Sequence, residues 1–181
     1  MTNDLTATAE QIRDWAHELG FQAVGITDTE LEETGQRLNQ WLDRGLNADL
    51  SYMAQHGEKR YRPAQLVEGT ERIIAVRLDY RPEPDAPDAV LADDEKAYIT
   101  RYSLGRDYHK LMRKRLAKLA KWIDEALPGY YHRAFVDSAP VMEKPIAVKA
   151  GLGWQGKHTL LLHPFLFNDT ATTEIYTSAP L

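Results

Sequence analysis

The sequence predicts the α/β or α+β class: a single domain in which helices flank a mixed sheet. Segments with apolar residues at helical spacing alternate with short runs rich in β-branched residues. The 181 residues, 43% of them hydrophobic, suit one domain with a core of its own. The chain shows neither an internal repeat nor a heptad array, which leaves an ordinary globular domain.

Four segments have the spacing of amphipathic helices, and each begins or ends at a recognisable signal. The first starts with a capping box at Thr8 and stops at Gly20. Asp28 or Thr29 can cap the second, Asp107 caps the third, and Pro140 lies in the first turn of the fourth. The predicted helices cover residues 8–20, 28–44, 107–127 and 140–150.

Short β-branched runs predict four strands, at residues 21–27, 72–80, 131–136 and 158–162. The second of them, RIIAVRLDY, is the strongest strand pattern in the chain. Residues 81–97 combine prolines with acidic residues and are predicted to form a surface loop, not a domain boundary.

Composition excludes several kinds of chemistry and favours the cytoplasm. Without cysteine, the chain cannot form disulfides, thiolate zinc sites or its own iron–sulfur clusters. The histidines show no metal-ligand spacing. No signal peptide is expected at the N-terminus, and no apolar run approaches the length of a membrane span.

The helix at 107–127 concentrates positive charge. Residues 1–100 hold 10 basic and 20 acidic residues, whereas residues 101–181 hold 12 and 7. One arc of the helix is apolar, and the opposite arc either binds nucleic-acid phosphates or is simply solvated. Arg115 projects into the apolar arc and is expected to be an internal anchor. The apolar arc holds Leu111, Met112, Leu116, Leu119, Trp122, Ile123 and Leu127, and the basic arc Lys110, Arg113, Lys114, Lys118 and Lys121.

Three stretches can carry chemistry. Residues 100–109 bring arginines, tyrosines and a histidine to a helix start, where they line an anion pocket or remain exposed. Asp137 follows an apolar strand and is either a buried proton donor or, like Ser138, a cap for the next helix. The glycine-rich residues 150–158 bring backbone amides to a polar cofactor or form a tight connection, and they lack phosphate-loop spacing.

Several spaced motifs together resemble the N-terminal, cobalamin-binding part of the epoxyqueuosine reductase family. The matching stretches are residues 58–63 (EKRYRP), 101–109 (RYSLGRDYH), 136–140 (VDSAP) and 149–162 (KAGLGWQGKHTLLL), and the resemblance covers roughly residues 5–164.

The resemblance implies a fold, a reaction and a set of contacts. The fold would be similar to the cobalamin domains of reductive dehalogenases and of a cobalamin-trafficking chaperone. The reaction would be the reduction of epoxyqueuosine to queuosine at the tRNA wobble position, the last step of queuosine synthesis. The residue matching the family's catalytic aspartate, the proton donor, is Asp137. Cobalamin contacts carry over onto Arg60, Thr100, Asp137 and Leu161.

The C-terminal residues depart from the family pattern. Residues 165–173 (FLFNDTATT) resemble a translated sequencing-adapter peptide, and residues 174–177 return to the family pattern. We therefore expect a cobalamin-binding catalytic domain at 1–164 and an aberrant or truncated tail at 165–181. The two [4Fe–4S] clusters of the full-length family have no ligands in this chain.

The partners expected from the resemblance are tRNA bearing epoxyqueuosine and an external electron donor. The protein is expected to be a cytoplasmic monomer that does not bind membranes. Two other functions remain open at this point: a cobalamin carrier of the chaperone kind, and a small RNA-binding module that uses the basic helix face.

Overall fold

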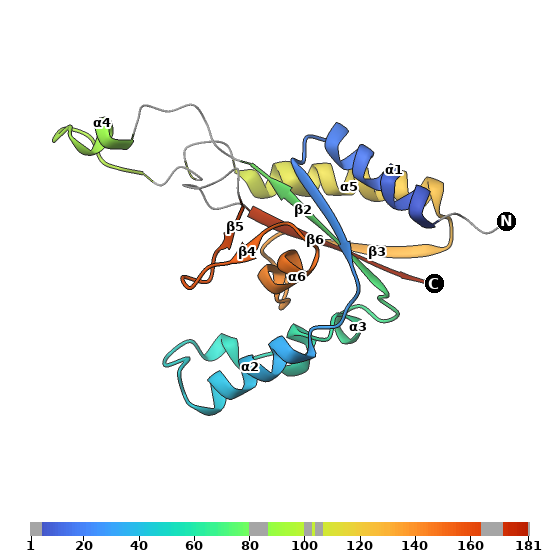
Figure 1. The fold of residues 1–181 in the computed structure, drawn as a ribbon, viewed down its shortest axis with the longest axis horizontal. Coiled ribbons are helices and arrows are strands. Elements are labelled where there is room, and N and C mark those ends of the chain that lie inside the picture. The colour runs from blue at the N-terminus through green and yellow to red at the C-terminus, as the bar shows by residue number, and fades with distance from the viewer. Residues whose placement is uncertain (1–4, 80–86, 100–102, 104–106, 164–171, 181) are drawn as a thin grey trace.

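The computed structural model describes residues 5–79, 87–99, 103, 107–163 and 172–180, the last stretch as backbone only. Its centre is a four-stranded sheet in the order β1-β2-β6-β3, with helices on both faces (Figure 1). The strands are β1 (Ala23–Thr27), β2 (Arg72–Leu78), β3 (Tyr130–Phe135) and β6 (Thr172–Pro180). All three strand pairings in this sheet are antiparallel.

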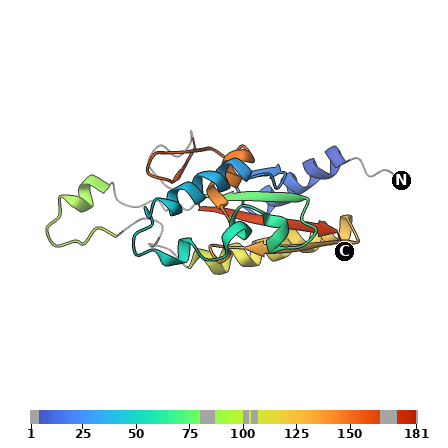
Figure 2. The same ribbon diagram turned by 90° about the horizontal axis from the view of Figure 1, so that it is seen from below.

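The helices form two layers, one on each face of the sheet. The helices α1 (Leu5–Glu18) and α5 (Tyr108–Ala126) pack together on one face, and α6 (Glu143–Lys149) covers the other. Figure 2 shows α5 and α6 on opposite sides of the strands. The remaining elements are α2 (Glu32–Asp43), the 3-10 turns η1 (Ser51–Met53) and η2 (Gly57–Arg60), α3 (Pro63–Leu66), α4 (Pro87–Leu91) and a hairpin of β4 (Trp154–Gln155) and β5 (Leu161–Leu162).

Strand β2 links two hydrophobic clusters because its side chains alternate between the faces of the sheet. Ile74 and Val76 pack with α1 and α5, whereas Ile73 and Ala75 pack with α6 and the hairpin. The strand is buried from Ile73 to Leu78. It is therefore shared by both halves of the core.

Helix α5 follows the sequence prediction closely. The Asp107 side chain caps it by accepting a hydrogen bond from the backbone N–H of His109 at 3.0 Å. Arg115 is an internal anchor as predicted: its Nη1 donates to the carbonyl of Gly20 at 3.1 Å, and its guanidinium lies over the Phe21 ring. Leu111 differs from the prediction, because it is 44% exposed at the edge of the apolar arc.

Three predicted helix starts were wrong. Helix α1 begins at Leu5, so Thr8 lies inside the helix and does not cap it. Helix α2 begins at Glu32 with no side-chain cap; Asp28 instead accepts a hydrogen bond from the backbone N–H of Glu30 and pairs with Lys149. Helix α6 begins at Glu143, not at Pro140, and neither Asp137 nor Ser138 caps it. Within the described residues, no helix is both long and apolar enough to cross a bilayer.

Candidate functional site

Asp137 lies two residues after the end of β3, with its carboxylate turned toward the first turn of α5. Its backbone is left-handed, with φ of +48°, and its side chain is 33% exposed. The Tyr108 hydroxyl donates a 2.5 Å hydrogen bond to Oδ2 of Asp137, and Nε2 of His109 lies 3.4 Å from the same oxygen. The carboxylate thus lies between the Tyr108 hydroxyl and the His109 imidazole and remains open to a ligand.

The start of α5 fixes both of these side chains. Nδ1 of His109 lies 3.0 Å from Oδ1 of Asp107, so the imidazole bridges two carboxylates, and its protonated form can donate to both. The Tyr108 and His109 rings stack with centroids 4.1 Å apart. The hydrogen bond with the His109 side chain lowers the pKa of Asp107. This end of the helix is therefore ordered by the same contacts that surround Asp137.

Glu143, the first residue of α6, is a second carboxyl group near Asp137. Burial raises the pKa of Glu143, and the negative charge of Asp137 raises it further, while Lys144 opposes the shift. A glutamate in this position favours its protonated form more than an exposed one does. The sequence prediction did not single out Glu143, because a glutamate in the first turn of a helix is ordinary.

A cleft of about 1330 Å³ lies between α2 and α6, and both Arg60 and Glu143 line it. The Arg60 side chain closes the loop before it: Nε donates to the carbonyl of Gln55 at 3.0 Å and Nη2 to that of Tyr52 at 2.6 Å. The carbonyl of Arg60 accepts from the backbone N–H of Met142 at 3.1 Å. Its Nη1 is the guanidinium nitrogen without a hydrogen bond to any described residue.

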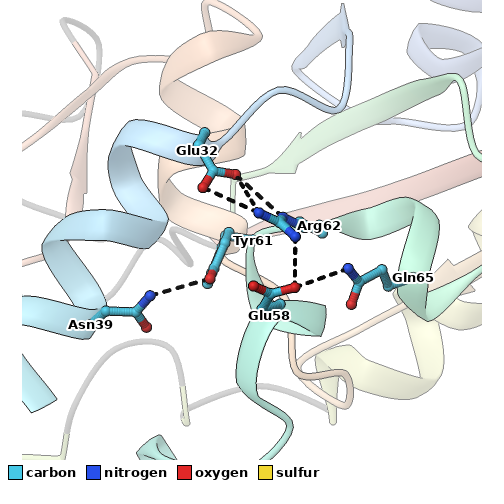
Figure 3. Close-up of polar contacts among 6 residues, drawn as sticks. All are labelled: Glu32, Asn39, Glu58, Tyr61, Arg62 and Gln65. Carbon is cyan, nitrogen blue, oxygen red and sulfur yellow. Dashed lines mark hydrogen bonds and ion pairs between the residues drawn. The ribbon is translucent and has the colours of Figure 1, made fainter.

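The segment that carries Arg60 is fastened to α2 (Figure 3). Arg62 pairs with Glu32 on α2 at 3.2 Å and with Glu58 on η2 at 2.6 Å. Asn39 on α2 donates to the hydroxyl of Tyr61, a residue that is almost completely buried. These contacts flank Arg60 on its C-terminal side and set its position at the cleft.

Three of the four residues that are predicted to contact the cofactor lie within the described part of the chain. They do not all lie together. Arg60 and Glu143 line the cleft, whereas Asp137 does not; the charge of Asp137 only acts on Glu143 by raising its pKa. The Leu161 side chain is 2% exposed in the hydrophobic cluster behind the β4–β5 hairpin, so a contact there would involve its backbone. Thr100 lies outside the described residues, as do the arginines of residues 100–109.

The glycine-rich stretch forms the turn into the β4–β5 hairpin. At Gly153, with φ of +158°, an added Cβ would lie 2.1 Å from the carbonyl oxygen of Leu162, so the hairpin needs a glycine there. Lys157 and His158 lie between the two strands. In the described ranges, no group of three or more acidic, histidine or cysteine side chains could hold a metal ion.

Comparisons with known proteins place these features in a family. The model of "Epoxyqueuosine reductase QueG, DUF1730" matches residues 60–138. The epoxyqueuosine reductase of Pseudomonas aeruginosa is 51% identical over 98% of this chain and 49% of its own length. That of Escherichia coli strain K12 is 49% identical over 88% of this chain and 42% of its own length. The chain thus spans about half the length of the curated relatives it matches.

Solved structures show the same fold at low sequence identity. An epoxyqueuosine reductase with an epoxyqueuosine-modified tRNA-Tyr stem loop has a TM-score of 0.78 at 20% identity, over 98% of this chain and 48% of its own. The Bacillus subtilis enzyme, with its catalytic aspartate loop swung out of the active site, has a TM-score of 0.80 at 20% identity, over 98% and 46%. A catabolic reductive dehalogenase has a TM-score of 0.62 at 18% identity, over 100% and 21%.

The fold is therefore the α+β domain that epoxyqueuosine reductases share with a reductive dehalogenase, which confirms the predicted fold class. By sequence, the chain is similar to the epoxyqueuosine reductases, which are oxidoreductases, over about half of their length.

Proposed function

We propose that residues 1–164 form the cobalamin-binding catalytic domain of an epoxyqueuosine reductase. It would remove the epoxide oxygen of epoxyqueuosine at the tRNA wobble position, the last step of queuosine synthesis. The observation that carries the proposal is Asp137, exposed at a strand end and held by Tyr108 and His109. The named activity of the relatives and the modified stem loop of one solved structure support it.

The reaction needs protons as well as electrons. Removing an epoxide oxygen as water consumes two electrons and two protons and leaves a carbon–carbon double bond. Reduced cobalamin, when bound, supplies the reducing power. Asp137 would donate a proton to the oxygen as its bond to carbon breaks, because an alkoxide is a poor leaving group. Tyr108 and His109 hold the carboxyl group in place and can return a proton to it.

The cleft suits a large cofactor with amide groups around a flat ring. Its volume of about 1330 Å³ exceeds the roughly 300–1,000 Å³ of pockets for drug-sized ligands. Nη1 of Arg60 can donate to a cofactor amide, and Trp41, Met53 and Val141 provide apolar walls. Arg60, Thr100, Asp137 and Leu161 remain the proposed contacts, with Leu161 acting through its backbone.

The remaining partners follow from the proposed reaction. Because the chain has no cysteine, it holds no iron–sulfur cluster of its own, and electrons would reach the cofactor from an external donor. We propose that the protein acts as a monomer in the cytoplasm, where its tRNA substrate is found.

Two measurements test the proposal. Purified chain is mixed with cob(II)alamin, and binding is followed by a change in the visible spectrum; Arg60→Lys should weaken it and Arg44→Lys should not. The complex, reduced chemically, is then given an anticodon stem loop bearing epoxyqueuosine, and loss of one oxygen is detected by mass spectrometry. Absence of binding rejects the proposal. Binding without oxygen loss from the wild-type chain favours a cobalamin carrier instead.

A further inference from the structure

Helix α5 presents a stripe of basic side chains on the side opposite its buried face. Lys110, Arg113, Lys114 and Lys118 are exposed, whereas the residues that face the sheet are buried. Residues three or four apart share one side of a helix. Between Tyr108 and Ile123 the helix holds no acidic residue, although the whole chain has a formal net charge of −5. We call these four residues the α5 stripe.

The charge of the α5 stripe is not neutralised by the described part of the protein. None of its four residues forms an ion pair there. On the other face of the sheet, Arg62 and Lys149 each pair with a carboxylate. Lys118 lies over the Trp122 ring at 4.6 Å, a contact that brings no opposite charge to it. An unpaired basic surface of this kind attracts polyanions.

The stripe begins at the candidate catalytic site. Lys110 follows His109, whose Nε2 lies 3.4 Å from Asp137. From Lys110 to Lys118 the helix rises about 12 Å, at about 1.5 Å per residue. One strand of double-stranded DNA carries a phosphate about every 3.4 Å along its axis, and at a spacing of this order on RNA the stripe can reach about three or four phosphates.

We propose that the α5 stripe binds the phosphate backbone of the RNA whose modified base is presented to Asp137. This inference rests on the proposed function and adds where the RNA backbone lies. Exposed lysine and arginine side chains contact phosphates without reading the bases. The stripe therefore orients the stem loop on the protein without selecting its sequence.

The test compares matched charge reversals in the chain. Binding of a fluorescent anticodon stem loop is measured between 50 and 200 mM salt (roughly the range over which phosphate contacts weaken). The double variant Lys110→Glu/Lys114→Glu should lose affinity on the order of tenfold or more, and its salt slope should be shallower by about 1 to 2. Lys110→Arg/Lys114→Arg should bind like the wild type. Arg44→Glu, just after the end of α2, should change the affinity for the stem loop by less than twofold, which corresponds to about 0.4 kcal/mol.

Other outcomes overturn the inference. The inference fails if the wild-type chain does not bind the stem loop, or if the salt slope of the double variant is unchanged. It also fails if Arg44→Glu loses as much affinity for the stem loop as the double variant does, or if the stripe binds anionic vesicles but not RNA. Cobalamin binding is measured on the same samples. If cobalamin binds and the stripe variants hold RNA as tightly as the wild type, the stripe is rejected and the proposed function stands. If cobalamin does not bind, the proposed function fails.

Discussion

At the scale of single residues, the backbone of Asp137 decides which substitution tests its role. A left-handed backbone favours asparagine and aspartate over other non-glycine residues. Asp137→Asn also keeps an oxygen for the Tyr108 hydroxyl. We expect its free energy of unfolding to remain within about 0.5 kcal/mol of the wild type. Asp137→Ala should lose about 1–2 kcal/mol, because alanine is strained there and Tyr108 loses its acceptor. Urea unfolding measures both, and equal losses would contradict this account.

Glu143 gives a pH-dependent prediction. Its pKa is raised above 4.5 by burial and by Asp137, so the folded chain keeps a proton that the unfolded chain releases. The stabilising contribution is complete below about pH 4.5 and is lost as the pH rises through the folded pKa. Glu143→Gln, which stays neutral, should therefore gain stability relative to the wild type between pH 5 and pH 8. Urea midpoints at the two pH values measure this. Glu125→Gln, at an exposed position of α5, is the control. A constant difference would show that Glu143 is ionised throughout.

At the scale of elements, the contact between α2 and the segment before α3 depends on one glycine. A Cβ at Gly35 would lie 2.3 Å from Cγ and Cδ2 of the buried Tyr61 ring. Gly35→Ala gains about 1 kcal/mol of helix propensity, but it forces the ring and α2 apart at a cost of about 1–3 kcal/mol. We expect a net loss of stability and weaker cobalamin binding through the displaced Arg60.

A double-mutant cycle separates the clash from other effects of Gly35→Ala. In a Tyr61→Leu background the ring is absent, so Gly35→Ala should become neutral or stabilising in thermal unfolding. A loss of the same size in both backgrounds would show that the ring is not the obstacle.

The elements also show what the sequence can predict. The bounds of α5 followed from its Asp107 cap and from Pro128 and Gly129, since these signals are local. The hydrogen bond between Tyr108 and Asp137 joins residues 29 positions apart, and no local sequence pattern indicates it. The sequence therefore points to the segment 100–109 and to Asp137 separately, but not to their contact. The division at residue 164 stays a prediction, while the backbone of 172–180 lies between β2 and β3.

At the scale of the whole molecule, β2 makes the two hydrophobic clusters one cooperative unit. Because Ile73 is fully buried on the α6 face and Ile74 and Val76 lie on the other, damage on one face should destabilise both. Ile73→Ala should cost about 2–5 kcal/mol. The tilted pair Trp15 and Trp122, with centroids 6.0 Å apart, reports on the α1–α5 layer.

The prediction is measured in a Trp41→Phe/Trp154→Phe background, where fluorescence comes only from that layer. In this background Ile73→Ala should shift the fluorescence midpoint and the far-ultraviolet circular dichroism midpoint in urea by the same amount, since one transition unfolds both layers. Leu111→Ala, at a 44% exposed position on α5, should change neither midpoint appreciably. The fluorescence midpoint could instead stay in place while part of the circular dichroism signal disappears at a lower urea concentration. That result would show that the α6 layer and its cleft unfold on their own. Cofactor binding would then stabilise only that layer.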